Sequence, residues 1–300
     1  MRAFFDSDIW WSFTRSWVTM ASALVAFICI AGALAAPLLA PHNPFDLASL
    51  QLMDAFKPPS WAAEGDQAFP LGTDDQGRDV LSAIMYGARV SLLVGISATI
   101  FALTLGVSFG LLAGYLGGPV DALLMRIADI QLTFPSILVA LLIDGIVRAA
   151  LPREVHEQIA LFVVILAIGV SEWPKFARTV RGSTLVERNK EYVLAARVIG
   201  LGRLKIIVQH VLPNVLGPVL VIGTLNLALA ILAEATLSFL GVGVPPTQPS
   251  LGTLIRIGND FLFSGEWWIT IFPGIALIIM VLSVNLLGDW LRDALNPKLR

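Results

Sequence analysis

The sequence predicts an all-α integral membrane protein with about six membrane-spanning helices and both chain ends on the cytoplasmic side. Hydrophobic residues make up 56% of the 300 residues and charged residues only 14%, whereas soluble domains carry roughly 25% charged residues. The apolar residues gather in six runs that approach the roughly 20 residues a helix needs to cross a bilayer. Most of the 20 lysines and arginines flank these runs on the side of the termini, which predicts that this side is cytoplasmic.

The predicted spans cover residues 17–39, 90–114, 122–147, 159–173, 215–240 and 269–287. The first follows Arg2 and Arg15 and contains the small-residue stretch ALAAP, so a cleaved signal peptide is an alternative. The run is longer than the roughly 7–15 residues of a signal-peptide core, which favours a permanent helix. Pro135 predicts a kink in the third span. The fourth run is short and ends at Trp173-Pro174, so this span is expected to extend a few residues further at one end.

Two regions are expected from this arrangement. Residues 1–86 would hold an N-terminal cytoplasmic tail, the first span and an extracytoplasmic loop, and residues 87–300 would hold a five-helix core. The loop is rich in proline, aspartate and glycine, and its dense charged turn at residues 74–79 would either contact a partner protein or brace the loop. The connection at 175–214 lies on the cytoplasmic side and belongs to the core.

This connection is the most cation-rich part of the chain, with Lys175, Arg178, Arg181, Arg188, Lys190, Arg197, Arg203 and Lys205. Charge alone would fit an anchor on anionic lipid headgroups. The pattern adds a short helix from Glu191 to Ile199, broken at Gly200 and Gly202, and a second apolar stripe that ends at Pro213. The small pair Ala195-Ala196 on such a helix would let another protein approach closely.

The stretch EYVLAARVIGLGRLKIIVQHVLP resembles the cytoplasmic EAA loop of ABC-importer permeases, with Ala195-Ala196, Gly200 and Leu212-Pro213 at the family's spacing. Leu194 and His210 depart from the usual residues. Three further stretches resemble the C-type subunit of the dipeptide/oligopeptide/nickel permeases: LGTDDQGRDVLSAIMYGARVSLLVG, AEATLSFLGVG and PGIALIIMVLSVNLLGDWLRDALNPKLR. Trp290 and Asn296 are small departures in the last one.

The resemblance implies the type I ABC-importer permease fold in the bacterial plasma (inner) membrane. It implies a second homologous permease subunit, two cytoplasmic ATPase subunits and an extracytoplasmic solute-binding protein as partners, besides the lipid bilayer and without nucleic acid. The chain lacks the G-x-x-x-x-G-K-[ST] phosphate loop, so ATP and Mg²⁺ would bind the partner ATPases and no cofactor would bind here. The residues implied to couple the chain to the ATPases are Glu191, Tyr192, Ala195, Ala196, Gly200, Gly202, Leu212 and Pro213.

Polar residues inside the predicted spans need a partner or a water-filled cavity. Asn226, Glu234 and Ser238 would either line the translocation path or hydrogen-bond between helices. Arg126 and Asp129, three residues apart, are expected to form a structural ion pair. The three histidines show no metal spacing.

The predicted function is that of a transport subunit, without enzymatic activity, that forms half of an import path for dipeptides or oligopeptides by alternating access. Nickel, glutathione, opines or another small solute remain alternatives within the same class, because a separate binding protein would select the solute. An intramembrane enzyme is disfavoured, because no catalytic constellation falls within the spans. A secondary transporter would not need a docking helix for an ATPase.

Overall fold

The computed structural model describes residues 8–46 and 50–295, so Arg2 and Asn296 lie outside the described residues. Within these ranges the chain is helical apart from turns, loops and an isolated bridge between Thr73 and Asp79. The helices are α2 (Asp8–Arg15), α3 (Trp17–Leu34), α4 (Ala36–Leu39), η1 (Leu52–Asp54), α5 (Val80–Leu116), α6 (Gly118–Leu132), α7 (Ser136–Ala150), α8 (Arg153–Glu187), α9 (Glu191–Val198), α10 (Arg203–Ile206), η2 (Ile207–Val211), α11 (Leu212–Phe239), α12 (Leu251–Asn259), η3 (Leu262–Ser264) and α13 (Trp268–Leu295).

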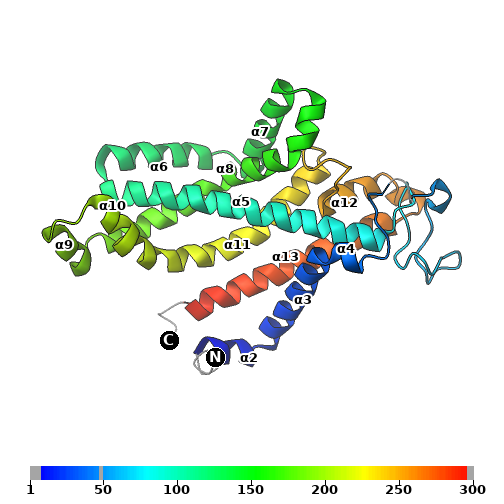
Figure 1. The fold of residues 1–300 in the computed structure, drawn as a ribbon, viewed down its shortest axis with the longest axis horizontal. Helices are drawn as coiled ribbons and strands as arrows, with labels where there is room; N and C mark the ends of the chain where they lie inside the picture. Colours follow the sequence, from blue (N-terminus) through cyan, green and yellow to red (C-terminus); the bar gives the residue numbers. More distant parts are fainter. Residues whose placement is uncertain (1–7, 47–49, 296–300) are drawn as a thin grey trace.

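Five helices in the described chain are long and apolar enough to cross a membrane, and the bent pair α6–α7 makes a sixth if it counts as one span. Figure 1 shows these helices in one elongated bundle, with α9 at one end and the 40–79 loop at the other. The N-terminal helix α2 lies near the C-terminal end of α13, where the rings of Phe13 and Trp290 are 5.2 Å apart. The two ends of the described chain, α2 and the last turn of α13, therefore lie on the same side of the bundle, which agrees with the prediction.

Helices α5 and α8 run parallel to each other along a stripe of small residues. A Cβ added to Gly110 would lie 2.6 Å from the Cβ of Val180, and one added to Gly114 would lie 2.6 Å from the Cβ of Thr184. Such close approach is typical of membrane helices whose interfaces carry small residues four apart. Because both helices run the same way, the chain between them, α6 and α7, has to return to the starting side.

The third span differs from the prediction of a continuous, kinked helix over residues 122–147. The chain breaks into α6 and α7, which meet at 93°. Pro135 has no backbone N–H and disfavours helical geometry at the residue before it, and it lies at the N-cap of α7 with extended ψ. The prediction places the change of direction correctly at Pro135, but the helix ends there and a new one begins instead of a single helix being kinked.

The fourth span is longer than predicted at both ends instead of one, because α8 runs from Arg153 through Pro174 to Glu187. A proline inside a helix leaves the carbonyl four residues earlier without its usual donor. Here that carbonyl belongs to Val170, and it accepts a hydrogen bond from the side-chain amide of Gln131 on α6. The amide oxygen of Gln131 accepts in turn from Trp173 Nε1 at 2.9 Å, so one side chain satisfies both groups.

The charged turn of the 40–79 loop is an internal brace. Asp74, Arg78 and Asp79 are all buried, and Arg78 Nε lies 2.6 Å from Asp74 Oδ2. Asp79 caps α5 by accepting from Ser82 N at 2.9 Å, and Trp268 Nε1 donates to Thr73 O at 3.0 Å. Of the two predicted roles for this turn, the geometry supports the brace, which ties the loop to the first turns of α5 and α13.

Candidate functional site

The segment 188–206, named here the α9 tip, carries apolar side chains on its outer surface. Val198 is 87% exposed, and Ile199 and Leu204 are each 74% exposed. The same helix turns Val193 and Ala196 inward, where they are buried in a cluster with Tyr115 and Ile206 among others. An exposed apolar patch on a packed helix rimmed by cations is typical of a surface that another protein covers.

Gly200 ends α9 as the sequence predicts. Its φ of +81° is a left-handed conformation, which glycine adopts at little cost. The backbone N–H of Gly200 donates to Arg197 O at 3.0 Å, and that of Leu201 donates to Ala196 O at 3.1 Å. This pair of bonds is a Schellman cap, which turns the chain sharply into α10 and gives the α9 tip a defined shape.

Tyr192 anchors the start of α9 to the end of α8. Its hydroxyl donates to the carboxylate of Glu187, which also accepts from Lys190 Nζ at 2.6 Å. Partial burial of the phenol and this bond to a carboxylate raise the pKa of Tyr192 to about 12. The predicted coupling residue Tyr192 therefore bonds to its own chain while its side chain stays 37% exposed, and Glu191 and Ala195 are exposed as well.

Two arginines connect the α9 tip with the end of α5. The guanidinium of Arg197 lies 5.1 Å from the ring centroid of Tyr115, a cation–π contact. Arg188 Nη1 donates to Gly114 O at 2.8 Å. Two side-chain contacts therefore join the α9 tip to the end of α5, and the tip follows α8 directly in the chain.

The predicted stop at Pro213 differs from the structure. After α10 the chain passes through a short π-helix, η2, and continues directly into α11. A π-helical turn accommodates a proline because the bonding pattern shifts by one residue and relieves the clash with the preceding turn. Leu212 and Pro213 thus form the first turn of a long helix that joins the tip to the membrane core, and Gly202 is the N-cap residue of α10.

The structure buries Glu234 and Ser238 among helices, and Ser238 also lines a cavity at the end of the bundle opposite the α9 tip. Glu234 is 0% exposed and accepts from Ser91 Oγ and Ser238 Oγ, each at 2.7 Å. Ser91 Oγ also accepts from Leu251 N at 3.2 Å. This group, named here the Glu234 clamp, joins α5, α11 and α12, which corresponds to the predicted alternative of helix–helix hydrogen bonding.

The other polar residues predicted within the spans, Asn226, Arg126 and Asp129, do not belong to the Glu234 clamp. Asn226 is 7% exposed and bonds within α11, to Ile222 O at 3.2 Å. The predicted pair of Arg126 and Asp129 does not form in the described chain. Asp129 instead lies 4.0 Å from Arg178 of α8, because α6 packs along α8 and presents this carboxylate across the helix interface.

Two features escaped the sequence interpretation. The glycines at 106, 110 and 114 are spaced by four, a pattern that predicts close helix packing in a membrane. Gln131 had no comparable signal, because its bond to Val170 O depends on how α6 packs beside Pro174. Both features set the position of α8, which leads directly to the α9 tip.

The family model for the inner membrane component of binding-protein-dependent transport systems matches residues 106–300. This match covers well over half of the chain. The chain belongs to this family. A second model, the N-terminal transmembrane domain of oligopeptide transport permease C, matches residues 5–59 of the permease. The permease is therefore a multi-pass transmembrane subunit of an ABC importer, which confirms the resemblance seen in the sequence.

The curated relatives of the permease include three named as transport permease proteins. The di/tripeptide permease protein DppC of Pseudomonas aeruginosa is 38% identical over 98% of this chain and 92% of its own length. The dipeptide permease proteins DppC of Haemophilus influenzae and Escherichia coli K12 are 36% and 41% identical over 98% of this chain, and 95% and 93% of their own lengths.

Among solved structures, two crystal forms of the MetNI methionine ABC transporter in inward-facing conformations resemble the permease. One gives a TM-score of 0.56 at 21% identity, and the other gives 0.53 at 20% identity. Each match covers 71% of this chain and 96% of the other chain. The match shows a shared fold, and it confirms the predicted type I ABC-importer permease architecture.

Proposed function

We propose that the permease forms half of an ATP-driven import path for dipeptides or short oligopeptides across the bacterial plasma membrane. The three relatives named as dipeptide or di/tripeptide permeases support this substrate class. In this proposal the α9 tip lies in the cytoplasm and the 40–79 loop lies outside.

Residues 1–86, which hold the N-terminal tail, the first span and the outer loop, attach the permease to the membrane. Residues 87–300 form the core, which builds the transport path together with a second permease subunit.

The exposed apolar side chains of the α9 tip support a docking site for a separate ATPase. Val198, Ile199 and Leu204 face water in the cytoplasm unless a partner covers them, and covering each one contributes about 1.5–3 kcal/mol. The ATPase subunits bind ATP and Mg²⁺, and a solute-binding protein delivers the peptide from outside. This chain itself holds no cofactor in the proposal.

The contacts of the tip supply a route for the motion. When two ATPases close on ATP, they move the α9 tip. The contacts of Arg197 with Tyr115 and of Arg188 with Gly114 carry this motion to α5, and the bond of Tyr192 to Glu187 carries it to α8. Rigid-body movement of packed helices then opens the path alternately to either side. ATP drives this change only by binding one of the two states more tightly than the other.

Docking is tested by replacing Val198 and Ile199 with aspartate in the complete importer. We expect co-purification of the ATPase to fall about tenfold or more, because the substitutions place charge in an apolar contact. The second permease subunit should still co-purify. Met53→Asp is the matched control, since Met53 is 91% exposed at the opposite end of the bundle. Unchanged ATPase recovery in the double variant would refute docking at this surface.

The substrate class is tested with the complete importer in proteoliposomes, with the solute-binding protein outside and ATP inside. We expect saturable, ATP-dependent uptake of radiolabelled alanyl-alanine. Parallel assays with nickel and with glutathione examine the alternative solutes. Uptake of one of these without uptake of the peptide would contradict the peptide assignment and leave the ATPase docking test unaffected.

A further inference from the structure

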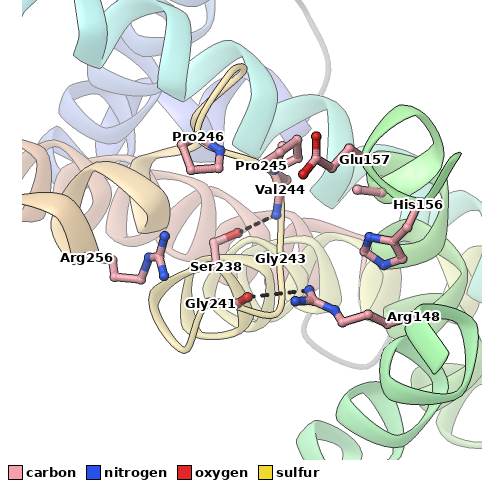
Figure 2. Close-up of a pocket in the computed structure, with 11 residues that line it drawn as sticks. Arg148, His156, Glu157, Ser238, Gly241, Gly243, Val244, Pro245, Pro246 and Arg256 are labelled. Carbon is pink, nitrogen blue, oxygen red and sulfur yellow. Dashed lines mark hydrogen bonds between the residues drawn. The ribbon is translucent and has the colours of Figure 1, made fainter. Parts of the chain in front are cut away.

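A cavity of about 510 Å³ lies at the end of the bundle opposite the α9 tip. Figure 2 shows it between the α7–α8 hairpin, the turn after α11 and the last turn of α12, which carries Arg256. Pro245, Pro246, Val244 and Ala160 give it apolar walls. This volume lies in the range of pockets that bind small organic ligands, roughly 300–1,000 Å³.

Two arginines line this cavity and approach the turn at Gly241 from opposite sides (Figure 2). Arg148 lies 3.3 Å from the buried carboxylate of Asp144, which also contacts His156 Nε2 at 3.4 Å. Arg148 also donates to Gly241 O at 3.5 Å. The charge of Arg148 is therefore balanced within the chain.

Arg256 of α12 has no such balance. Its Nε is buried without a hydrogen-bond acceptor, and within the part of the chain that the structure describes no carboxylate forms an ion pair with it. A Cβ added to Gly241 would lie 2.9 Å from Arg256 Nη1, so the absence of a side chain at 241 leaves room for the guanidinium. The protein encloses this Nε, so the Nη groups are the part of the guanidinium that a ligand in the cavity can reach, and an anion there would supply the charge that the chain does not.

We propose that this cavity receives the C-terminal carboxylate of the transported peptide, with Arg256 as its partner. A carboxylate supplies both the charge and the acceptor atoms that a guanidinium binds through two parallel hydrogen bonds. The apolar walls accommodate the adjacent side chain of the peptide. This inference rests on the proposed function, and it assigns to the permease a recognition site of its own, separate from the solute-binding protein.

The test compares uptake of alanyl-alanine with uptake of alanyl-alanine amide, which lacks the carboxylate, by the complete importer in proteoliposomes. Arg256→Gln should lower uptake of alanyl-alanine about tenfold relative to the unmodified importer, and it should change uptake of the amide less than about twofold. Arg256→Lys, which keeps the charge, should retain more alanyl-alanine uptake than Arg256→Gln. Arg89→Gln is the control, because Arg89 is exposed and lies outside this cavity.

Several outcomes would overturn the site. Equal losses for both peptides with intact binding-protein docking would mean that Arg256 only stabilises the C-terminal end of α11. If uptake of both peptides falls equally and the solute-binding protein binds the variant more weakly, Arg256 contacts the solute-binding protein and not the peptide. No loss for either peptide would remove the site altogether.

A second measurement does not depend on transport. Pro246→Cys places a thiol at the exposed wall of the cavity, and its reaction with a membrane-impermeant maleimide is followed in the complete importer. Alanyl-alanine should slow this reaction, the amide should not, and adding Arg256→Gln should abolish the protection. Equal rates with and without alanyl-alanine would overturn the site. Protection without uptake would support the site and count against the peptide-import proposal.

Discussion

Single side chains resolve the local conflicts that prolines create in this membrane protein. Pro174 frees the carbonyl of Val170, and an unpaired carbonyl in lipid has no water to accept from. Gln131 donates to that carbonyl and accepts from Trp173 Nε1. One residue of α6 thus permits α8 to continue beyond the membrane to the α9 tip.

We expect Gln131→Leu to destabilise the permease by about 2–4 kcal/mol, because it leaves two part-buried polar groups without partners at about 1–3 kcal/mol each. The measurement is thermal unfolding of the purified importer in detergent. Gln158→Leu is the control, since Gln158 is exposed at the start of α8. Equal unfolding temperatures for Gln131→Leu and the unmodified protein would contradict this role.

Tyr192 gives a second residue-scale prediction. The permease has 3 tyrosines, so the absorbance difference between the unmodified protein and Tyr192→Phe isolates the titration of this phenol. Its midpoint is expected near pH 12 instead of 10. Glu187→Gln should move the midpoint down toward 10, whereas Glu191→Gln, on an exposed side chain, should not.

The raised pKa of Tyr192 also predicts how the stability of the folded permease changes with pH. The folded state holds the Tyr192 proton more tightly than the unfolded state, so the stabilising contribution is complete below pH 10 and is lost as the pH rises toward 12. Tyr192→Phe should remove this part of the pH dependence of unfolding. An unchanged pH dependence would contradict the bond to Glu187.

At the scale of elements, the interface of α5 and α8 depends on residues that have no side chain. Gly110 and Gly114 let the two helices approach closely while they run parallel. The resulting pair is the rigid connection between the α9 tip and the opposite end of the bundle. Helix association in lipid relies on such packing, because apolar burial drives it little.

Gly110→Ala should destabilise the permease by about 1–3 kcal/mol, because the added Cβ would lie 2.6 Å from Ala177 O and from the Cβ of Val180, which is overpacking. Gly217→Ala is the matched control in α11, where a Cβ meets nothing within 4 Å. Alanine there should be neutral or stabilising by up to about 1 kcal/mol. Thermal unfolding of both variants measures the contrast, and similar shifts in the two would refute the close packing.

At the scale of the whole molecule, the parallel course of α5 and α8 requires the bent pair α6–α7 to bring the chain back across the bundle. The bundle then has the α9 tip, α2 and the last turn of α13 on one side and the 40–79 loop on the other. This arrangement agrees with the excess of lysine and arginine near the tip. The Glu234 clamp and the cavity at Arg256 lie toward the loop side.

Labelling of single cysteines tests this arrangement in a Cys29→Ser background. Met53→Cys should react with a membrane-impermeant maleimide in intact cells, because Met53 is 91% exposed in the outer loop. Val198→Cys, at 87% exposure, should react only after the cells are permeabilised. Reaction of Val198→Cys in intact cells would reverse the proposed orientation and remove the ATPase docking site.

The sequence by itself determined the fold class, the family and the position of the short helix α9 that ends at Gly200. Hydrophobic runs and cation distribution are local properties of the chain, and the lipid environment acts on them directly. Gly200 is equally local, because a left-handed helix cap requires glycine whatever the helix packs against. Residues such as these could be predicted without knowing any distant contact.

Only the tertiary structure decided the roles of the buried polar residues and prolines. Whether Pro174 ends a helix depends on Gln131, 43 positions earlier in the sequence numbering, and whether Glu234 lines a path depends on Ser91 of another helix. Asp129 forms its ion pair with Arg178 of α8 and not with the nearby Arg126. A polar group in a membrane is satisfied by whichever donor or acceptor the packing brings within about 3 Å, and that distance is set by the fold as a whole.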